Sequence, residues 1–354
     1  MVRGGQTLFR AKGKELWREL LMRDYEKGGL SFLILGPKGQ GKSTLLATIA
    51  LTSLQLGDIV VWRGRERDFW PRLPRELVKV FVHENDELKI FRLKPGEAQG
   101  NDITESIEVS KFKSIEDLYT SLEAGKINVI YEPTYHQPSE KLKEIADTTA
   151  EWLNGRFWWF DFFIYLSRRI DARFMTVCID EIDDLFPSGS SGLLWRALES
   201  IQHSLAEFRE KLIWLFGTTH DPGHVDPRTL KKFDGFIYLR GAIAPRRSTM
   251  PDKNAPAKLS LGQGIIEIRG RGYGGFEFEK IPHDGYLYAI EKRWKGPEVR
   301  ISKKSIKDEI TKIAEERGVE KAMAKLQQLR LEGRISERYY YILKSSLTRG
   351  QPTP

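Results

Sequence analysis

The sequence predicts an α/β fold: a mostly parallel sheet covered by helices, followed by a small β-hairpin region and a C-terminal helical module. Up to about residue 241, short apolar runs alternate with segments of helical periodicity. The runs are continuously apolar, which is typical of parallel strands buried on both faces. After residue 239 the pattern changes, first to Gly-rich short strands and then to helical periodicity alone.

The elements follow in chain order. Apolar positions at near-helical spacing in the first 28 residues predict an amphipathic helix. Strands are predicted at residues 31–35, 59–63, 88–93, 127–131, 174–179, 212–217 and 235–239. Helices are predicted between them at residues 42–56, 115–124, 140–170 and 193–208. The aromatic run at residues 157–166 and three tryptophans are expected in the core rather than in base stacking: Trp62, Trp70 and Trp214.

The last third of the chain differs in composition. Residues 242–260 are rich in Pro, Lys and Arg, and residues 262–290 predict short antiparallel strands with Gly-rich turns. Residues 302–347 predict two or three helices, including a helix-turn-helix pair with its turn at Gly333. We therefore divide the chain into an N-terminal helix (1–28), a core (29–241), a basic linker with a hairpin (242–295) and a helical module (296–354).

The net charge of +8 is not spread evenly. Residues 1–239 hold 33 basic and 35 acidic side chains, whereas residues 240–271 and 291–338 each carry a net charge of +5. A basic surplus favours a polyanionic partner. The candidate contacts with a phosphate backbone lie in the first basic segment, where a solvated charged face is the alternative: Arg246, Arg247, Lys253 and Lys258.

A single Cys excludes an intrachain disulfide, and with no apolar leader after Met1 it favours a reducing cytoplasm. The most apolar stretch is about ten residues long and is interrupted by Asp161, roughly half of what a membrane span needs. One Cys and six scattered His give no zinc spacing, so we expect no zinc site.

The strongest motif is GPKGQGKS at residues 36–43, which fits GxxxxGK followed by Ser or Thr. Glycines allow several backbone N–H groups to converge on phosphates, and the following helix directs its positive end at the anion. Lys42 would reach the β- and γ-phosphates of ATP, and Ser43 would bind Mg²⁺. The expected nucleotide-binding residues are Gly36, Pro37, Lys38, Gly39, Gln40, Gly41, Lys42, Ser43 and Thr44.

Two further strands end in polar residues. An apolar run delivers Asp180, which would hold Mg²⁺ through water, and Glu181, which would orient and deprotonate the attacking water. Another strand ends in Thr218, Thr219 and His220, which would contact the γ-phosphate or the attacking water. Among these three we assign Thr219 and His220 to catalysis, although turn-forming hydroxyls at a strand end are the alternative.

These three motifs, in this order, resemble the additional-strand P-loop ATPases. Two families within that class are similar to the sequence. GTTHDPGHVDPRTLKKFDGFIYL resembles an AAA+ sensor region, while the HerA/FtsK group is similar over roughly residues 30–285, including LGQGIIEIRGRGYGGFEFEKIP. An AAA+ protein should have a helical lid directly after Leu239, where a hairpin is predicted instead, so HerA/FtsK is favoured. His220 stands where that family has Gln, and the VVWRGR strand lacks an acidic residue.

The resemblance implies a ring homo-oligomer, expected to be a hexamer, that hydrolyses ATP with Mg²⁺ and moves double-stranded DNA, which would stimulate turnover. It also implies an arginine supplied to the site by the neighbouring subunit, for which Arg209 is preferred over Arg196 and Arg228. The resemblance would also suit a protein encoded by an archaeal mobile element. Alternatives are an AAA+ replication initiator or remodeller, and a signalling or scaffold ATPase whose C-terminal helices, similar to a SHOCT-type module, bind protein.

Overall fold

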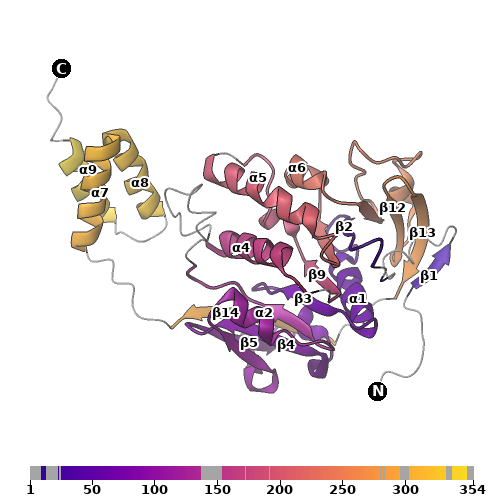
Figure 1. Ribbon diagram of the computed structural model, residues 1–354. Coiled ribbons are helices and arrows are strands. Elements are labelled where there is room, and N and C mark those ends of the chain that lie inside the picture. Colours follow the sequence, from indigo (N-terminus) through magenta and orange to yellow (C-terminus); the bar gives the residue numbers. More distant parts are fainter. Residues whose placement is uncertain are drawn as a thin grey trace. The chain divides into compact units, whose positions relative to one another are not determined.

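The computed structural model describes residues 9–12, 23, 25–136, 154–171, 173–190, 192–279, 281, 284–295, 303–331 and 337–348 (Figure 1). The chain divides into two compact units, Met1–Trp294 and Lys295–Pro354. The first unit contains the predicted sheet and its covering helices, and the regular elements described in the second unit are helices.

The main sheet of the first unit has eleven strands in the order β1-β13-β12-β11-β2-β10-β9-β3-β8-β4-β7. Its parallel strands are β11 (Gly235–Leu239), β2 (Ser31–Leu35), β10 (Ile213–Thr219), β9 (Met175–Ile179), β3 (Ile59–Arg63), β8 (Ile127–Ile130), β4 (Val78–His83) and β7 (Val109–Phe112). The strands β12 (Gln263–Ile268), β13 (Gly272–Phe278) and β1 (Phe9–Lys12) continue the sheet in antiparallel pairing beside β11. The predicted mostly parallel α/β fold is therefore confirmed.

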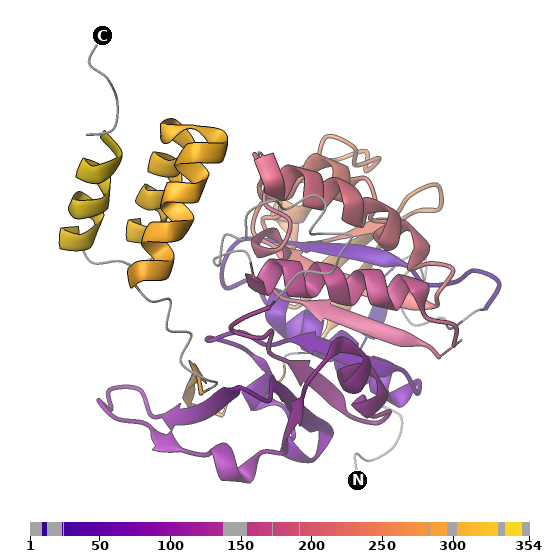
Figure 2. The same cartoon turned by 60° about the vertical axis from the view of Figure 1, so that its left-hand side comes forward.

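Helices cover both faces of this sheet. Their bounds are α1 (Lys42–Gln55), α2 (Ile115–Ser121), α4 (Asn154–Arg168), α5 (Gly192–Glu207) and α6 (Pro227–Leu230). Side chains of α2, α4 and α5 belong to one hydrophobic cluster, while those of α1 belong to a second cluster on the other face. In Figure 2 the magenta α4 and the red α5 lie side by side. Short 3₁₀ turns connect elements: η2 (Trp70–Arg72), η3 (Arg75–Leu77), η4 (Thr104–Ser106), η6 (Ile182–Asp184), η7 (Pro222–His224) and η8 (Ala255–Lys258).

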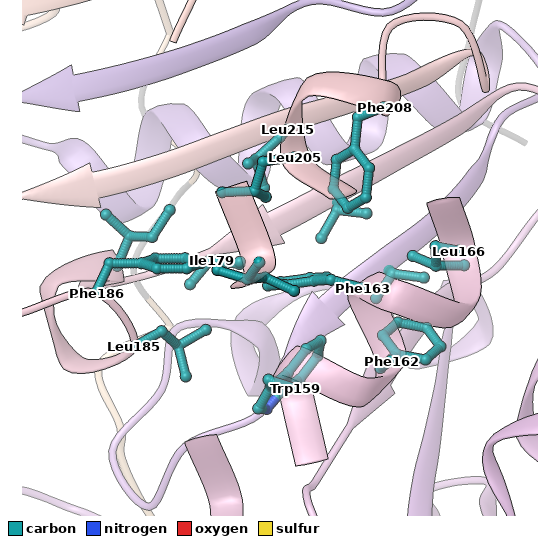
Figure 3. Packing of buried hydrophobic residues seen from close by; sticks show 14 of the residues in the cluster. Trp159, Phe162, Phe163, Leu166, Ile179, Leu185, Phe186, Leu205, Phe208 and Leu215 are labelled. Carbon is teal, nitrogen blue, oxygen red and sulfur yellow. The ribbon is translucent and has the colours of Figure 1, made fainter. Parts of the chain in front are cut away.

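The aromatic run of α4 forms the centre of the first cluster, as Figure 3 shows. The ring of Phe163 stacks on that of Phe186 at 6.3 Å between centroids and meets the edge of Phe208 at 5.6 Å. The predicted core role of this run is confirmed, since only its Tyr165 is partly exposed among its aromatic residues. The three tryptophans assigned to the core are also buried, at 0–1% exposure: Trp62, Trp70 and Trp214.

Three strands form a separate antiparallel sheet in the order β14 (Leu287–Trp294), β5 (Asp86–Leu93) and β6 (Asn101–Asp102). The strand predicted at residues 88–93 exists, but it lies in this small sheet and not in the parallel one. Strands β4 and β7 were not predicted. The N-terminal amphipathic helix is wrong at Phe9–Lys12, where β1 pairs with β13, and most of the remainder lies outside the described residues, as does the 140–153 part of the predicted long helix.

The hairpin predicted after the parallel core is confirmed. Strands β12 and β13 are antiparallel neighbours, and their pairing joins Gln263 to Glu277 and Ile268 to Gly272. Residues 240–262 are described throughout and contain one short helical turn, η8. A β hairpin, and not a helical lid, therefore follows β11.

The second unit has three described helices, α7 (Lys303–Arg317), α8 (Val319–Leu331) and α9 (Glu337–Thr348). They enclose a small core of their own, made of Ile310, Ala322, Leu326, Leu329, Tyr340 and Leu343. The prediction of two or three helices here is confirmed, while the turn at Gly333 lies outside the described residues. Among the helices that the structure describes in the two units, none has the length and apolar character needed to cross a bilayer.

Candidate functional site

The order of the central strands brings the three predicted motifs to one edge of the sheet. Strand β10 lies between β2 and β9 and is parallel to both, with Thr219 paired to Leu35 and Gly217 paired to Ile179. The loops after these three strands therefore open at the same carboxyl edge, where open α/β sheets bind ligands. The phosphate loop, the Asp180–Glu181 pair and His220 come together there.

The phosphate loop joins β2 to α1. Gly39 and Gly41 have φ values of 81° and 88°, a left-handed region that residues with a Cβ rarely adopt. The loop thereby turns directly into α1, whose N-cap is Gly41 and whose first residue is Lys42. Free backbone N–H groups at the start of a helix, together with its dipole, form an anion site.

Lys42 extends back into the loop and is 6% exposed. Its Nζ donates hydrogen bonds to Gly36 O at 2.7 Å, Pro37 O at 3.1 Å and His220 Nδ1 at 2.8 Å. Because an ammonium group only donates, His220 accepts through Nδ1 and carries its proton on Nε2. Burial lowers the pKa of Lys42, and the charges of Asp180 and Glu181 oppose that shift.

Ser43 and Asp180 form the proposed metal site. Ser43 Oγ donates to Asp180 Oδ2 at 2.7 Å, and Thr218 Oγ1 donates to Asp180 Oδ1 at 2.5 Å. The backbone N–H of Glu181 donates to Thr218 Oγ1 at 2.9 Å, which fixes the end of β9 against the end of β10. Within the described part of the chain there is no group of three or more His, Cys, Asp or Glu suited to a metal. A hydroxyl and one carboxylate fit Mg²⁺, which keeps most of its ligands as water and phosphate oxygens.

Glu181, the predicted general base, is paired with an arginine that the sequence analysis did not assign. Arg65 Nη2 lies 2.5 Å from Glu181 Oε2 and 3.1 Å from Asp184 Oδ2. His220 Nε2 lies 3.7 Å from the other carboxylate oxygen, Glu181 Oε1. Burial raises the pKa of Glu181, but the hydrogen bond and charge of Arg65 outweigh it, so this pKa lies below its ordinary value. Glu181 itself has a φ of 51°, a strained conformation that is common at functional sites.

Arg65 reaches the site because β3 is the parallel neighbour of β9. The sequence contained a signal, namely Arg63 and Arg65 at a strand end that lacks acidic residues, but the pairing of β3 with β9 was needed to interpret it. Asp68 holds this loop by accepting hydrogen bonds from Trp62 Nε1 and from the backbone N–H of Arg65 and of Phe69. Burial raises the pKa of Asp68 to about 7.

Two other predicted catalytic residues lie outside this cluster. Thr219 is fully buried and donates its hydroxyl to Asp221 O at 3.1 Å, so Thr218 and not Thr219 is the threonine that contacts Asp180. Arg209 lies before the amino end of β10, at the opposite edge of the sheet, and its Nε donates to Lys27 O at 3.0 Å. Arg209 is therefore away from the phosphate loop of its own chain.

The four predicted DNA contacts lie between β11 and β12, and all four side chains are exposed: Arg246, Arg247, Lys253 and Lys258. Lys258 pairs with Asp252 at 2.9 Å, which reduces the charge it offers a partner. Arg247 lies close enough to Arg269 to lower the pKa of that residue further, beyond the larger effect of its burial. Arg246 and Arg247 are adjacent in the sequence, and both side chains are exposed.

No protein-family model matches this chain, and no significant match to a curated protein is found. Solved structures do match. The chain is similar to the genome packaging NTPase B204 from Sulfolobus turreted icosahedral virus 2, with 11% identity over 72% of this chain and 98% of that one, at a TM-score of 0.35. It is similar to VirB4 of Thermoanaerobacter pseudethanolicus, with 13% identity over 75% and 93% of the two chains, at a TM-score of 0.41.

A third match is the pCW3 conjugation coupling protein TcpA, with 13% identity over 73% of this chain and 62% of that one, at a TM-score of 0.37. The three matched structures are thus those of a genome packaging NTPase, VirB4 and a conjugation coupling protein. The fold of this chain rests on the strand order and the phosphate loop described above.

Proposed function

We propose that this chain is a Mg²⁺-dependent ATPase that works as a ring-shaped motor, expected to be a hexamer, on double-stranded DNA. One observation carries the ATPase assignment: Lys42, Ser43, Asp180 and Glu181 meet at the carboxyl edge of three adjacent strands. A phosphate loop alone predicts nucleotide binding, and an ionised carboxylate beside it adds a group able to deprotonate water.

Phosphates of ATP would replace the present partners of Lys42. Its Nζ now bonds to two loop carbonyls and to His220, all of which phosphate oxygens can displace as acceptors. Bound Mg²⁺ would be held by Ser43 and Asp180 and would neutralise charge on the β- and γ-phosphates. Thr218 keeps the Asp180 carboxylate in place through its hydrogen bond to Oδ1.

Glu181 is the proposed base because its carboxylate follows Asp180 directly and lies 3.7 Å from His220, which contacts Lys42; its lowered pKa leaves it ionised at neutral pH, as a glutamate ordinarily is. Its two oxygens face Arg65 and the Nε2–H side of His220. An attacking water must therefore find room beside these two groups to give its proton to Glu181. His220 contacts both Lys42 and Glu181, so it connects the phosphate-binding cation to the base.

The DNA and ring components rest on sequence resemblance and on charge. The net charge of +5 in residues 240–271 lies largely in the exposed segment that precedes β12, where Arg246 and Arg247 are adjacent. Phosphate-backbone binding needs such cations and no base-specific contacts. Arg209 lies at the edge of the sheet opposite the ATP site of its own chain. Its proposed catalytic role therefore requires that it enter the site of a neighbouring subunit.

The alternatives differ in the element expected after β11 and in the role of the C-terminal unit. An AAA+ initiator should have a helical lid where the described residues form the β12–β13 hairpin. A scaffold ATPase would use the three-helix unit, which has a hydrophobic core of its own, to bind protein. The motor proposal requires that this chain assemble around DNA.

The test is a pair of measurements on the full chain. Lys42→Ala should abolish Mg²⁺-dependent ATP hydrolysis. Lys232→Ala should not change it, because this exposed lysine precedes the amino end of β11, at the edge of the sheet opposite the site. When ATP and duplex DNA are added, the mass in solution of a Glu181→Gln variant should rise to that of a ring. Hydrolysis that survives Lys42→Ala contradicts the ATPase assignment, and a mass that stays monomeric contradicts the ring.

A further inference from the structure

A cavity of about 260 Å³ adjoins the phosphate loop. Three segments line it: the loop with the first turn of α1, the segment before and within η2, and the residues around β12 and β13. The lining residues are Gly39, Gly41, Thr44, Phe69, Arg72, Leu261, Gly262, Phe278 and Ile281. None of the residues assigned to the γ-phosphate or to the metal is among them.

The cavity is continuous with the phosphate loop. The ring of Phe278 lies so near Gly41 that a Cβ on this glycine would be 3.5 Å from Phe278 Cζ. Thr44 follows Ser43 directly, so the cavity begins one residue beyond the proposed metal ligand. A nucleotide whose γ-phosphate faces Glu181 must place its base past this loop, and the cavity lies there.

The walls of the cavity suit a flat aromatic group. Phe69 and Phe278 present rings, and the guanidinium of Arg72 lies 5.4 Å from the ring centroid of Phe69. Arg72 Nε is buried and has no hydrogen-bond acceptor among the described residues. Aromatic rings and guanidinium planes are the surfaces on which nucleobases stack.

We propose that this cavity holds the purine base of the bound nucleotide by stacking and does not select adenine over guanine. The assignment rests on the proposed function, since it presumes a triphosphate on the loop. Only two lining side chains are polar, Thr44 and Arg72. The Arg72 donor that lacks an acceptor is Nε, and it can donate to N7, which both purines offer, so this hydrogen bond does not distinguish them. The Thr44 hydroxyl donates and accepts equally well, so neither side chain favours the adenine amino group.

The experiment measures binding to the full chain by calorimetry with Mg²⁺ and three probes: AMPPNP, GMPPNP and inorganic tripolyphosphate. The two nucleotides should bind with Kd values within about threefold of each other, and tripolyphosphate should bind about tenfold or more weakly. Phe278→Ala should weaken both nucleotides about tenfold and leave tripolyphosphate unchanged. Tyr273→Ala, an exposed ring on the same strand β13, is the matched control and should change neither.

Phe69→Ala provides a second variant outside the sheet, and it should have the same selective effect as Phe278→Ala. If the unmodified chain binds one purine nucleotide more than about tenfold more tightly than the other, the proposal that the cavity does not select between adenine and guanine is overturned. If the variants lose equal affinity for the nucleotides and for tripolyphosphate, or if neither variant loses affinity, the base site is overturned while the proposed function stands. If no probe binds the unmodified chain, the proposed function fails, and the base site fails with it.

Discussion

Replacing Arg65 with Ala removes the cation that pairs with Glu181, the proposed base. The two side chains approach to 2.5 Å, and Arg65 is also 3.1 Å from Asp184. The Arg65 side chain is 24% exposed and that of Glu181 is 37% exposed, so the pair is neither buried nor fully solvated. Loss of the cation should raise the pKa of Glu181, because burial already acts in that direction.

The size of this shift follows from the separation and the exposure. Unit charges about 4 Å apart interact by roughly 4 kcal/mol at an effective dielectric constant of 20. Since more than a third of the Glu181 side chain faces solvent, we reduce this interaction to about 1–2 kcal/mol. Each pKa unit corresponds to about 1.4 kcal/mol, so the expected rise is about one unit.

The assay is the pH profile of kcat/KM for ATP hydrolysis between about pH 3.5 and 8, which covers the region below the ordinary glutamate pKa and reports groups of the free enzyme. The acid limb should move up by about one pH unit in Arg65→Ala and stay in place in Arg67→Ala, an exposed arginine of the same loop. An acid limb that does not move in Arg65→Ala would show that Glu181 is not the titrating base or that Arg65 does not control it.

Three further predictions concern the base, the DNA contact and the loop that carries Arg65. Glu181→Gln should bind ATP but lower its turnover about 10²- to 10⁴-fold, measured by phosphate release, and a near-normal rate would exclude Glu181 as the base. Joint replacement of Arg246 and Arg247 by Gln should weaken duplex binding and reduce the slope of log K against log salt by about 2, while ATP binding stays constant; an unchanged slope contradicts the contact. Burial raises the pKa of Asp68 to about 7, above its unfolded value, so its neutral form stabilises the fold below the unfolded pKa and this contribution is lost as pH rises through 7. Urea unfolding at pH 5 and pH 8 should therefore show a smaller loss of stability at the higher pH for Asp68→Asn than for the unmodified chain, and equal losses would refute the assignment.

Residues whose roles depend on local sequence could be predicted. Lys42 and Ser43 follow from the loop and helix around them, and Asp180 follows from a buried strand that ends at a carboxylate. Their convergence also required that the strands be parallel neighbours, which continuous apolar runs favour. The structure then adds the order of the strands, with β10 between β2 and β9.

The features that sequence reasoning missed depend on strand order, register or distant pairing. Arg65 enters the site only because β3 pairs with β9. Thr218, and not Thr219, faces Asp180 because β10 continues to Thr219 and successive side chains alternate between faces. The sequence near the N-terminus has helical periodicity, but Phe9–Lys12 forms a strand because it pairs with β13. That partner lies more than 260 residues later in the chain, so local sequence could not predict it.

The central claim, ATP hydrolysis coupled to double-stranded DNA, is tested most directly by the rate of ATP turnover with and without duplex DNA at moderate salt. We expect hydrolysis that requires Mg²⁺, disappears in Lys42→Ala and rises when duplex DNA is added. A rate that duplex DNA leaves unchanged would contradict the motor proposal.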